Sequence, residues 1–171
     1  MKALELTNAL VALYGNSSIL SNMKLNKLAY FAYASNLRRG YKLFDDEIQA
    51  WQYGPVIPSI YHAYSRYGSA GVHALTQPVE SISKEAFIAA HNVWKEYGFM
   101  TAIDLMKYSH KPDGAWKHVF NANKNCMRIS DNDILASADG QKPPSKEGTF
   151  SQALDNASAR WDNVLKMLSC N

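Results

Sequence analysis

Histidine, serine and acidic side chains are the groups of this 171-residue chain that could carry out acid–base or nucleophilic chemistry. Ser109, His110 and Asp113 stand close together in the sequence, and a hydrolytic triad uses these residue types. Proximity in sequence does not establish a triad, because a triad is defined by where its side chains meet in space. His62 lies in a tyrosine-rich stretch, where it could orient a phenol. We expect structural roles for the histidines, and the sequence predicts no catalytic residue.

The acidic residues and cysteines are not spaced as metal ligands. Asp45, Asp46 and Glu47 are adjacent, so their carboxylates point in different directions, and no ligand-bearing loop surrounds them. Cys126 and Cys170 lie far apart, with no histidine or cysteine near them at ligand spacing. The chain also lacks a glycine-rich phosphate loop and a nucleophile elbow. The sequence therefore predicts no metal and no cofactor, and its cysteine usage favours a reducing cytoplasm.

Charge and hydropathy limit the classes of partner. The formal net charge is +3 and the basic residues are scattered, whereas a nucleic-acid-binding domain gathers them on one face. No stretch reaches the roughly 20 apolar residues of a membrane helix, and the N-terminus does not have the pattern of a signal peptide. We expect a cytoplasmic, single-domain protein that binds neither nucleic acid nor membrane.

Helical periodicity dominates the elements that would position these residues. A central helix, apolar on most sides and therefore buried, is predicted from its cap Asn22 to about Arg39, with Gly40 just past its end. Another helix is predicted over Leu6–Leu13, and further helices are predicted to begin at Pro58, Ser83 and Thr101 and to surround Trp116. The helix that begins at Ser83 has a predicted buried stripe of Phe87, Ala90, Trp94 and Tyr97. The last of this group begins at Ser130, which forms a capping box with Asp133.

A period-two alternation over residues 47–53 is typical of a short strand. Gly54-Pro55 is predicted to break it with a rigid corner, because Pro55 disfavours a helical conformation at Gly54. Residues 72–79 and 126–130 are the candidate pairing strands. The predicted fold class is mainly α (α+β): a compact single helical domain around a central buried helix, with a small β element and a C-terminal amphipathic helix.

The C-terminal part reads as a linker over residues 139–149 and a helix over 150–171. Its apolar residues keep helical spacing: Phe150, Leu154, Ala157, Trp161, Val164, Leu165 and Leu168. Because so large an apolar stripe is not left in water, the helix is expected to pack on the core, which we favour, or on a partner or a second copy in a homodimer.

Large aromatic residues concentrate around the Gly54-Pro55 corner. Trp51 and Tyr53 fall on one face of the predicted strand. Tyrosine and tryptophan dominate the energetics of protein–protein contacts, but they also fill cores. We favour the core for this group, more strongly for Trp51 than for Tyr53, and keep a partner-binding surface as the alternative.

The stretch around this corner resembles the Panacea domain, also called SocA-like, of bacterial and phage antitoxins. The matching residues are the runs Lys24–Phe31, Leu43–Ile48 and Ala50–Pro58, then Tyr61 and Tyr67-Gly68, followed by a second signature of Leu105, Ser109-His110 and Trp116. The second signature departs from the family pattern, because Asp113-Gly114 intervenes where an acidic residue usually leads almost directly to the tryptophan. The resemblance covers roughly residues 22–138, within a domain expected over 1–138.

The resemblance implies an antitoxin that neutralises a cognate, often translation-blocking, protein toxin by direct binding. The alternatives are an adaptor that delivers its toxin to a AAA+ protease, a phage or mobile-element regulatory protein that reuses the domain, and, less favoured, an enzyme with an unrecognised site near His62, His110 and Asp45. The candidate partner-binding residues are Lys27, Tyr30, Trp51, Tyr53, Pro55, Val56, Tyr61, His110 and Trp116.

Overall fold

The structure is a computed structural model that describes residues 1–73, 82–124 and 126–169, with side chains as far as residue 159. Its helices are α1 (Ala3–Tyr14), α2 (Asn22–Arg38), α3 (Pro58–Tyr64), α4 (Lys84–Tyr97), α5 (Ala102–Ser109), α6 (Ala115–Val119), α7 (Asp131–Ala136) and α8 (Phe150–Ser169), with one 3-10 turn at Ser65–Tyr67. The strands are β1 (Gln49–Trp51), β2 (Gly54–Val56) and β3 (Met127–Arg128). The predicted fold class, mainly helical with a small β element, is confirmed.

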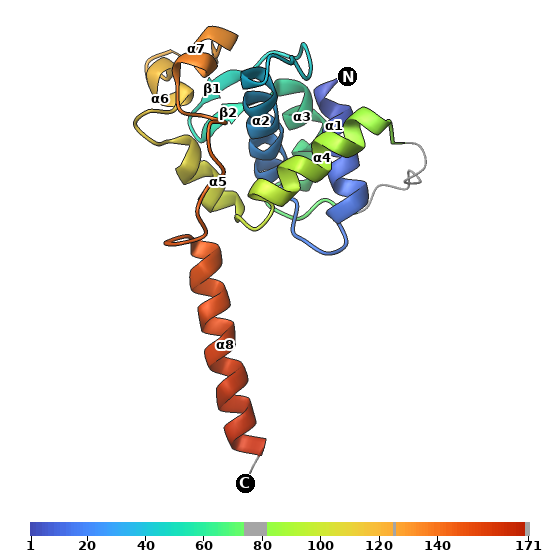
Figure 1. Ribbon diagram of the computed structural model, residues 1–171, viewed down its shortest axis with the longest axis vertical. Coiled ribbons are helices and arrows are strands. Elements are labelled where there is room, and N and C mark those ends of the chain that lie inside the picture. The colour runs from blue at the N-terminus through green and yellow to red at the C-terminus, as the bar shows by residue number, and fades with distance from the viewer. Residues whose placement is uncertain (74–81, 125, 170–171) are drawn as a thin grey trace.

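Helix α2 is the centre of the domain. It packs against α1, α3 and α4 on one side and against β2, α5 and α7 on the other, and Figure 1 shows it between these two groups. Ser21 caps it by accepting a hydrogen bond from the Lys24 N–H at 3.3 Å, so the predicted cap, Asn22, is wrong by one residue. Gly40 follows the helix with φ of +79°, as predicted from the preference of glycine for this region.

The sheet is antiparallel and has the order β2-β1-β3. Trp51 pairs with Gly54 across a two-residue turn, so Gly54-Pro55 continues the extended structure as β2, where we predicted a break. Pro55 is tolerated because β2 is an edge strand, where a missing N–H need not be paired. The candidate strand at 126–130 is confirmed by β3. Of the candidate at 72–79, residues 74–79 lie outside the described part of the chain.

Helix α4 begins at the predicted cap, since Ser83 accepts a hydrogen bond from the Ala86 N–H at 3.2 Å. Its buried face was predicted less well. The buried residues are Ala86, Ala89, Ala90, Val93 and Tyr97, whereas Phe87 is 43% exposed. Small alanines let α4 lie close to α1 and α2, and Phe87 stacks instead on His91 at the surface.

Helix α8 leaves the domain as a single rod (Figure 1). It contacts the domain at α5, and Phe150 and Leu154 are each nearly half exposed. The packing of its apolar stripe on the core, which we favour, or on a partner stays a prediction. The Asp104 carboxylate holds its first turn by accepting hydrogen bonds from the N–H groups of Phe150 at 2.7 Å and Ser151 at 3.1 Å. Burial alone would raise the pKa of Asp104, but these bonds and those from Thr101 outweigh it and lower the pKa.

Candidate partner-binding site

The two signatures that carry the family resemblance meet in space. Lys27 on α2 donates a hydrogen bond from Nζ to the Pro55 carbonyl of β2 at 3.0 Å. Gly54 has φ of +101°, and a Cβ there would stand 2.6 Å from Ser109 Oγ and 2.8 Å from Lys27 Cε. Only glycine fits this close approach. Helix α2, strand β2 and the end of α5 are therefore locked together at this point.

A stack of rings continues from this junction. His110 lies on Trp116 with ring centroids 3.8 Å apart, and Trp116 lies on Phe120 at 4.6 Å. Trp116 Nε1 donates a hydrogen bond to the Trp51 carbonyl at 2.7 Å, which ties α6 to β1. Burial lowers the pKa of His110, and the nearby charges of Lys27 and Lys117 lower it further. The imidazole is therefore neutral at pH 7 and serves as a stacking surface.

Lys27 is an unusual residue, because it is only 1% exposed. Burial lowers its pKa to about 7, and no carboxylate pairs with it among the residues that the structure describes. An amine with such a pKa has the reactivity of a nucleophile. A substrate has no access to it in this conformation, however, and among the described residues its ammonium group donates to the backbone of β2. Its role is to hold the hairpin on α2.

Tyr30 and Asp139 form a second buried connection. The Tyr30 hydroxyl donates to Asp139 Oδ2 at 2.6 Å, and the Ala115 N–H donates to the same oxygen at 2.9 Å. Lys111 Nζ stands 3.6 Å from the other carboxylate oxygen. Burial, followed by the Asp139 charge, raises the pKa of Tyr30. Asp139 is 0% exposed and belongs to the folded unit, although the sequence placed it at the start of the linker.

The predicted partner-binding residues divide into buried and accessible ones. Five of them are buried and help to shape the domain in this conformation: Lys27, Tyr30, Pro55, Val56 and Trp116. Their role in partner binding stays a prediction. Trp51 and His110 are half-buried, and Tyr53 and Tyr61 are 57% and 38% exposed.

The accessible aromatic residues come from β1, from the turn that follows it and from α3. Trp51 and Tyr61 meet edge to face with centroids 4.8 Å apart, and Tyr53 stands in the adjoining turn between β1 and β2. We call Trp51, Tyr53 and Tyr61 the aromatic surface. The prediction that these residues belong to the core is therefore wrong for Tyr53, which is exposed, whereas Trp51 is half-buried.

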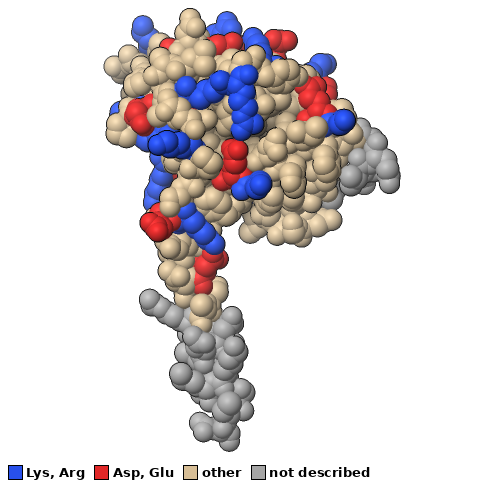
Figure 2. All heavy atoms as spheres, in the orientation of Figure 1, with Lys and Arg blue, Asp and Glu red and all other residues tan. Residues whose placement is uncertain are grey.

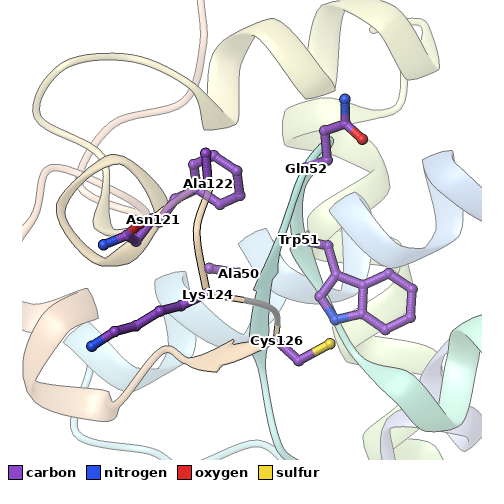
Figure 3. Close-up of a pocket in the computed structure, with 8 residues that line it drawn as sticks. Ala50, Trp51, Gln52, Asn121, Ala122, Lys124 and Cys126 are labelled. Carbon is purple, nitrogen blue, oxygen red and sulfur yellow. The ribbon is translucent and has the colours of Figure 1, made fainter.

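A groove of about 630 Å³ borders this surface. Its lining residues are Ala50, Trp51 and Gln52 from β1 and Phe120, Asn121, Ala122, Lys124 and Cys126 from the segment between α6 and β3. Figure 3 shows this segment opposite β1, with the Lys124 side chain extending away from the strand. β3 pairs only with Gln49 and Ala50, so the groove opens where that pairing ends. Sequence reasoning missed the second wall, because its short polar residues carry no motif.

The remaining candidates for chemistry do not assemble. Ser109 Oγ donates to the Met106 carbonyl at 2.7 Å, which leaves the predicted cluster without a Ser–His bond. Asp46 accepts from the Ala3 N–H and from Ser59 Oγ, whereas Asp45 faces Lys42. Within residues 1–73, 82–124 and 126–169 the structure shows no group of acidic, histidine or cysteine side chains able to hold a metal ion. No described helix is long and apolar enough to cross a membrane.

Charged side chains do not gather into a stripe on the face that Figure 2 shows. Lysine and arginine are interspersed there with aspartate and glutamate. A nucleic-acid interface requires a continuous basic surface, and this face offers none.

The fold combines a central helix, a hairpin held on it by a buried lysine, and exposed aromatic residues beside that hairpin. The family described as "Antitoxin SocA-like, Panacea domain" matches residues 25–117, more than half of the chain, and the chain belongs to this family. The curated protein "Antitoxin SocA" of Caulobacter vibrioides (strain NA1000 / CB15N) is 28% identical to it over 116 residues, which cover 60% of this chain. The match spans 61% of that relative, so about two fifths of it has no counterpart in the alignment. No solved structure gave a significant match.

Proposed function

We propose that this protein is an antitoxin that neutralises a protein toxin by direct binding. Membership of the SocA-like antitoxin family is the observation that carries the proposal. The aromatic surface supports it, because Tyr53 in the turn between β1 and β2 and Tyr61 on α3 remain exposed. Tyrosine is enriched among the residues that contribute most to protein–protein binding.

The test is co-expression with the toxin encoded beside this chain. We expect the chain to restore growth and to co-purify with the toxin. Separate elution together with unrestored growth would contradict the proposal. The toxin's abundance separates direct neutralisation from delivery to a AAA+ protease: sequestration leaves the toxin intact in the complex, whereas delivery removes it only while the protease is present.

The contact surface can be tested with matched tyrosines. We expect Tyr53→Ala and Tyr61→Ala each to weaken toxin binding by at least about tenfold, the effect of losing a contact worth roughly 1.4 kcal/mol. Tyr41 is 50% exposed and bonds Glu85 away from the aromatic surface, so Tyr41→Ala is the control and should bind as the wild type does. Equal binding by all three variants would remove the aromatic surface from the proposal.

A further inference from the structure

Two buried asparagines of α2 connect this helix to α3. Asn22 and Asn26 lie one turn apart and are 6% and 2% exposed. Asn26 Oδ1 accepts a hydrogen bond from the Ile57 N–H at 2.9 Å, and Asn26 Nδ2 donates to Asn22 Oδ1 at 2.8 Å. Asn22 Nδ2 then donates to the Tyr61 carbonyl at 2.9 Å. We call this chain of hydrogen bonds, from the N–H of Ile57 to the carbonyl of Tyr61, the amide relay.

The amide relay requires a side chain with both a donor and an acceptor at each of its two positions. The Ile57 N–H can only donate, so Asn26 must turn its oxygen toward it. The Tyr61 carbonyl can only accept, so Asn22 must turn its nitrogen toward it. The remaining ends of the two amides then face each other as donor and acceptor, which fixes the orientation of both side chains.

The amide relay holds α3, the helix that carries Tyr61. This helix has seven residues, and a helix so short is not stable in isolation, so its placement depends on tertiary contacts. Ile57 is its N-cap, and the Ile57 carbonyl accepts from the Tyr61 N–H at 3.0 Å. Together with the bond from Lys27 to the Pro55 carbonyl, the relay fastens this backbone to α2 at three points. The Tyr61 ring meets Trp51 at 4.8 Å, so the relay sets the position of one partner in that contact.

We propose that Asn22 and Asn26 are positioning residues for toxin binding, because the amide relay holds Tyr61 in the edge-to-face arrangement with Trp51 that the toxin contacts. This inference rests on the proposed antitoxin function and on the aromatic surface as the contact surface. Both buried asparagines act through Tyr61. Holding a surface in its bound conformation before the partner arrives raises affinity, because binding then removes less conformational freedom.

The experiment measures binding of the full chain to the toxin encoded beside it. Asn22→Asp keeps the size of the side chain and an acceptor for Asn26, but it removes the donor to the Tyr61 carbonyl. Asn36→Asp is the matched control, because the Asn36 amide donates to the Ala32 carbonyl within α2 at 2.8 Å. At 10 °C, after correction for the folded fraction, we expect at least about fivefold weaker binding for Asn22→Asp and at most about twofold for the control. Asn22→Ala takes the place of Asn22→Asp if the latter does not fold.

A double-mutant cycle distinguishes positioning from a general effect on stability. Because Asn22 acts through Tyr61, Asn22→Asp in a chain that already carries Tyr61→Ala should weaken binding by at most about a further twofold. A loss equal to the product of the two single losses would overturn the proposal. In the NMR spectrum of the free chain, the indole N–H resonance of Trp51 should shift in Asn22→Asp and stay in place in Asn36→Asp, because the neighbouring Tyr61 ring moves. An unshifted resonance in Asn22→Asp would also overturn it.

The outcomes separate this inference from the function on which it rests. If Tyr61→Ala weakens binding while Asn22→Asp binds as the control does, the positioning role is overturned and the antitoxin function stands. If Tyr61→Ala binds as the wild type does, both the contact through Tyr61 and the positioning role are overturned. A wild-type chain that neither binds the toxin nor restores growth overturns the antitoxin function as well.

Discussion

Replacing Gly54 by alanine should destabilise the junction of α2, β2 and α5. Two terms add at this position. The φ of +101° is strained for any residue with a Cβ, at a cost of about 1–3 kcal/mol. The added methyl group would also stand 2.6 Å from Ser109 Oγ and 2.8 Å from Lys27 Cε. Overpacking of this kind costs about 1–3 kcal/mol, so we expect the free energy of unfolding to fall by roughly 2–6 kcal/mol.

Gly40 provides the matched control for this substitution. It has φ of +79° and nothing within 4 Å of the position of an added Cβ. Gly40→Ala therefore reports the backbone term alone, about 1–2 kcal/mol. Urea unfolding followed by tryptophan fluorescence measures both variants against the wild type. If Gly54→Ala is no less stable than Gly40→Ala, then Lys27 and Ser109 yield without cost, and the junction is not the rigid lock that its geometry indicates.

Three further substitutions test the buried connections. Burial lowers the pKa of Lys27 to about 7 from its ordinary 10.5. Between about pH 7 and 10 the unfolded chain therefore holds a proton that the folded chain has released, so the free energy of unfolding rises with pH. Lys27→Met should flatten that rise in urea titrations at pH 7 and 9.5, and an unchanged slope contradicts the assignment. Tyr30→Phe removes the hydroxyl that donates to buried Asp139 at 2.6 Å and should lower the free energy of unfolding by about 1–3 kcal/mol. The control, Tyr108→Phe, loses only a 3.3 Å bond at the surface and should lower it by under about 0.5 kcal/mol. Equal losses of stability would show that the buried bond has no special role. Asp104→Ala removes the cap shared by α5 and α8 and should lower the free energy of unfolding by about 1–2 kcal/mol. Hydrogen exchange should then speed up at the Phe150 and Ser151 amides. Unchanged exchange at these amides would show that Asp104 does not anchor α8.

Local sequence signals were sufficient for most of the helices. Capping by Ser83, Thr101 and Ser130 depends on residues at most three positions away, so the pattern itself contains the interaction. The helix after Pro58 was found for the same reason, since proline is favoured in the first helical turn. These are the positions where propensity and tertiary structure agree.

Features that depend on distant partners were not accessible from the sequence. Gly54-Pro55 has the composition of a turn, and only its pairing with β1 makes it a strand. Asp139 stands in a segment with linker composition, yet it is buried because Tyr30, 109 positions away, donates to it. The exposure of Tyr53 follows likewise from its place in a two-residue turn, which no alternation pattern distinguishes from a strand interior. The groove was missed because its second wall is set by where β3 ends.

Burial distinguishes the signature residues that stabilise the fold from those that a partner could contact. Trp116 is 6% exposed and Tyr53 is 57% exposed, although both were candidates for partner binding. Trp116→Phe removes the hydrogen bond to the Trp51 carbonyl and should lower the free energy of unfolding by about 1–3 kcal/mol. It should weaken toxin binding only in proportion to the unfolded fraction, so that binding recovers at lower temperature. Tyr53→Ala should leave stability unchanged within about 0.5 kcal/mol and weaken binding at every temperature. Calorimetry at 10 °C and 30 °C distinguishes the two, and a Trp116 variant that stays weak at 10 °C while fully folded would show that this tryptophan reaches the toxin directly.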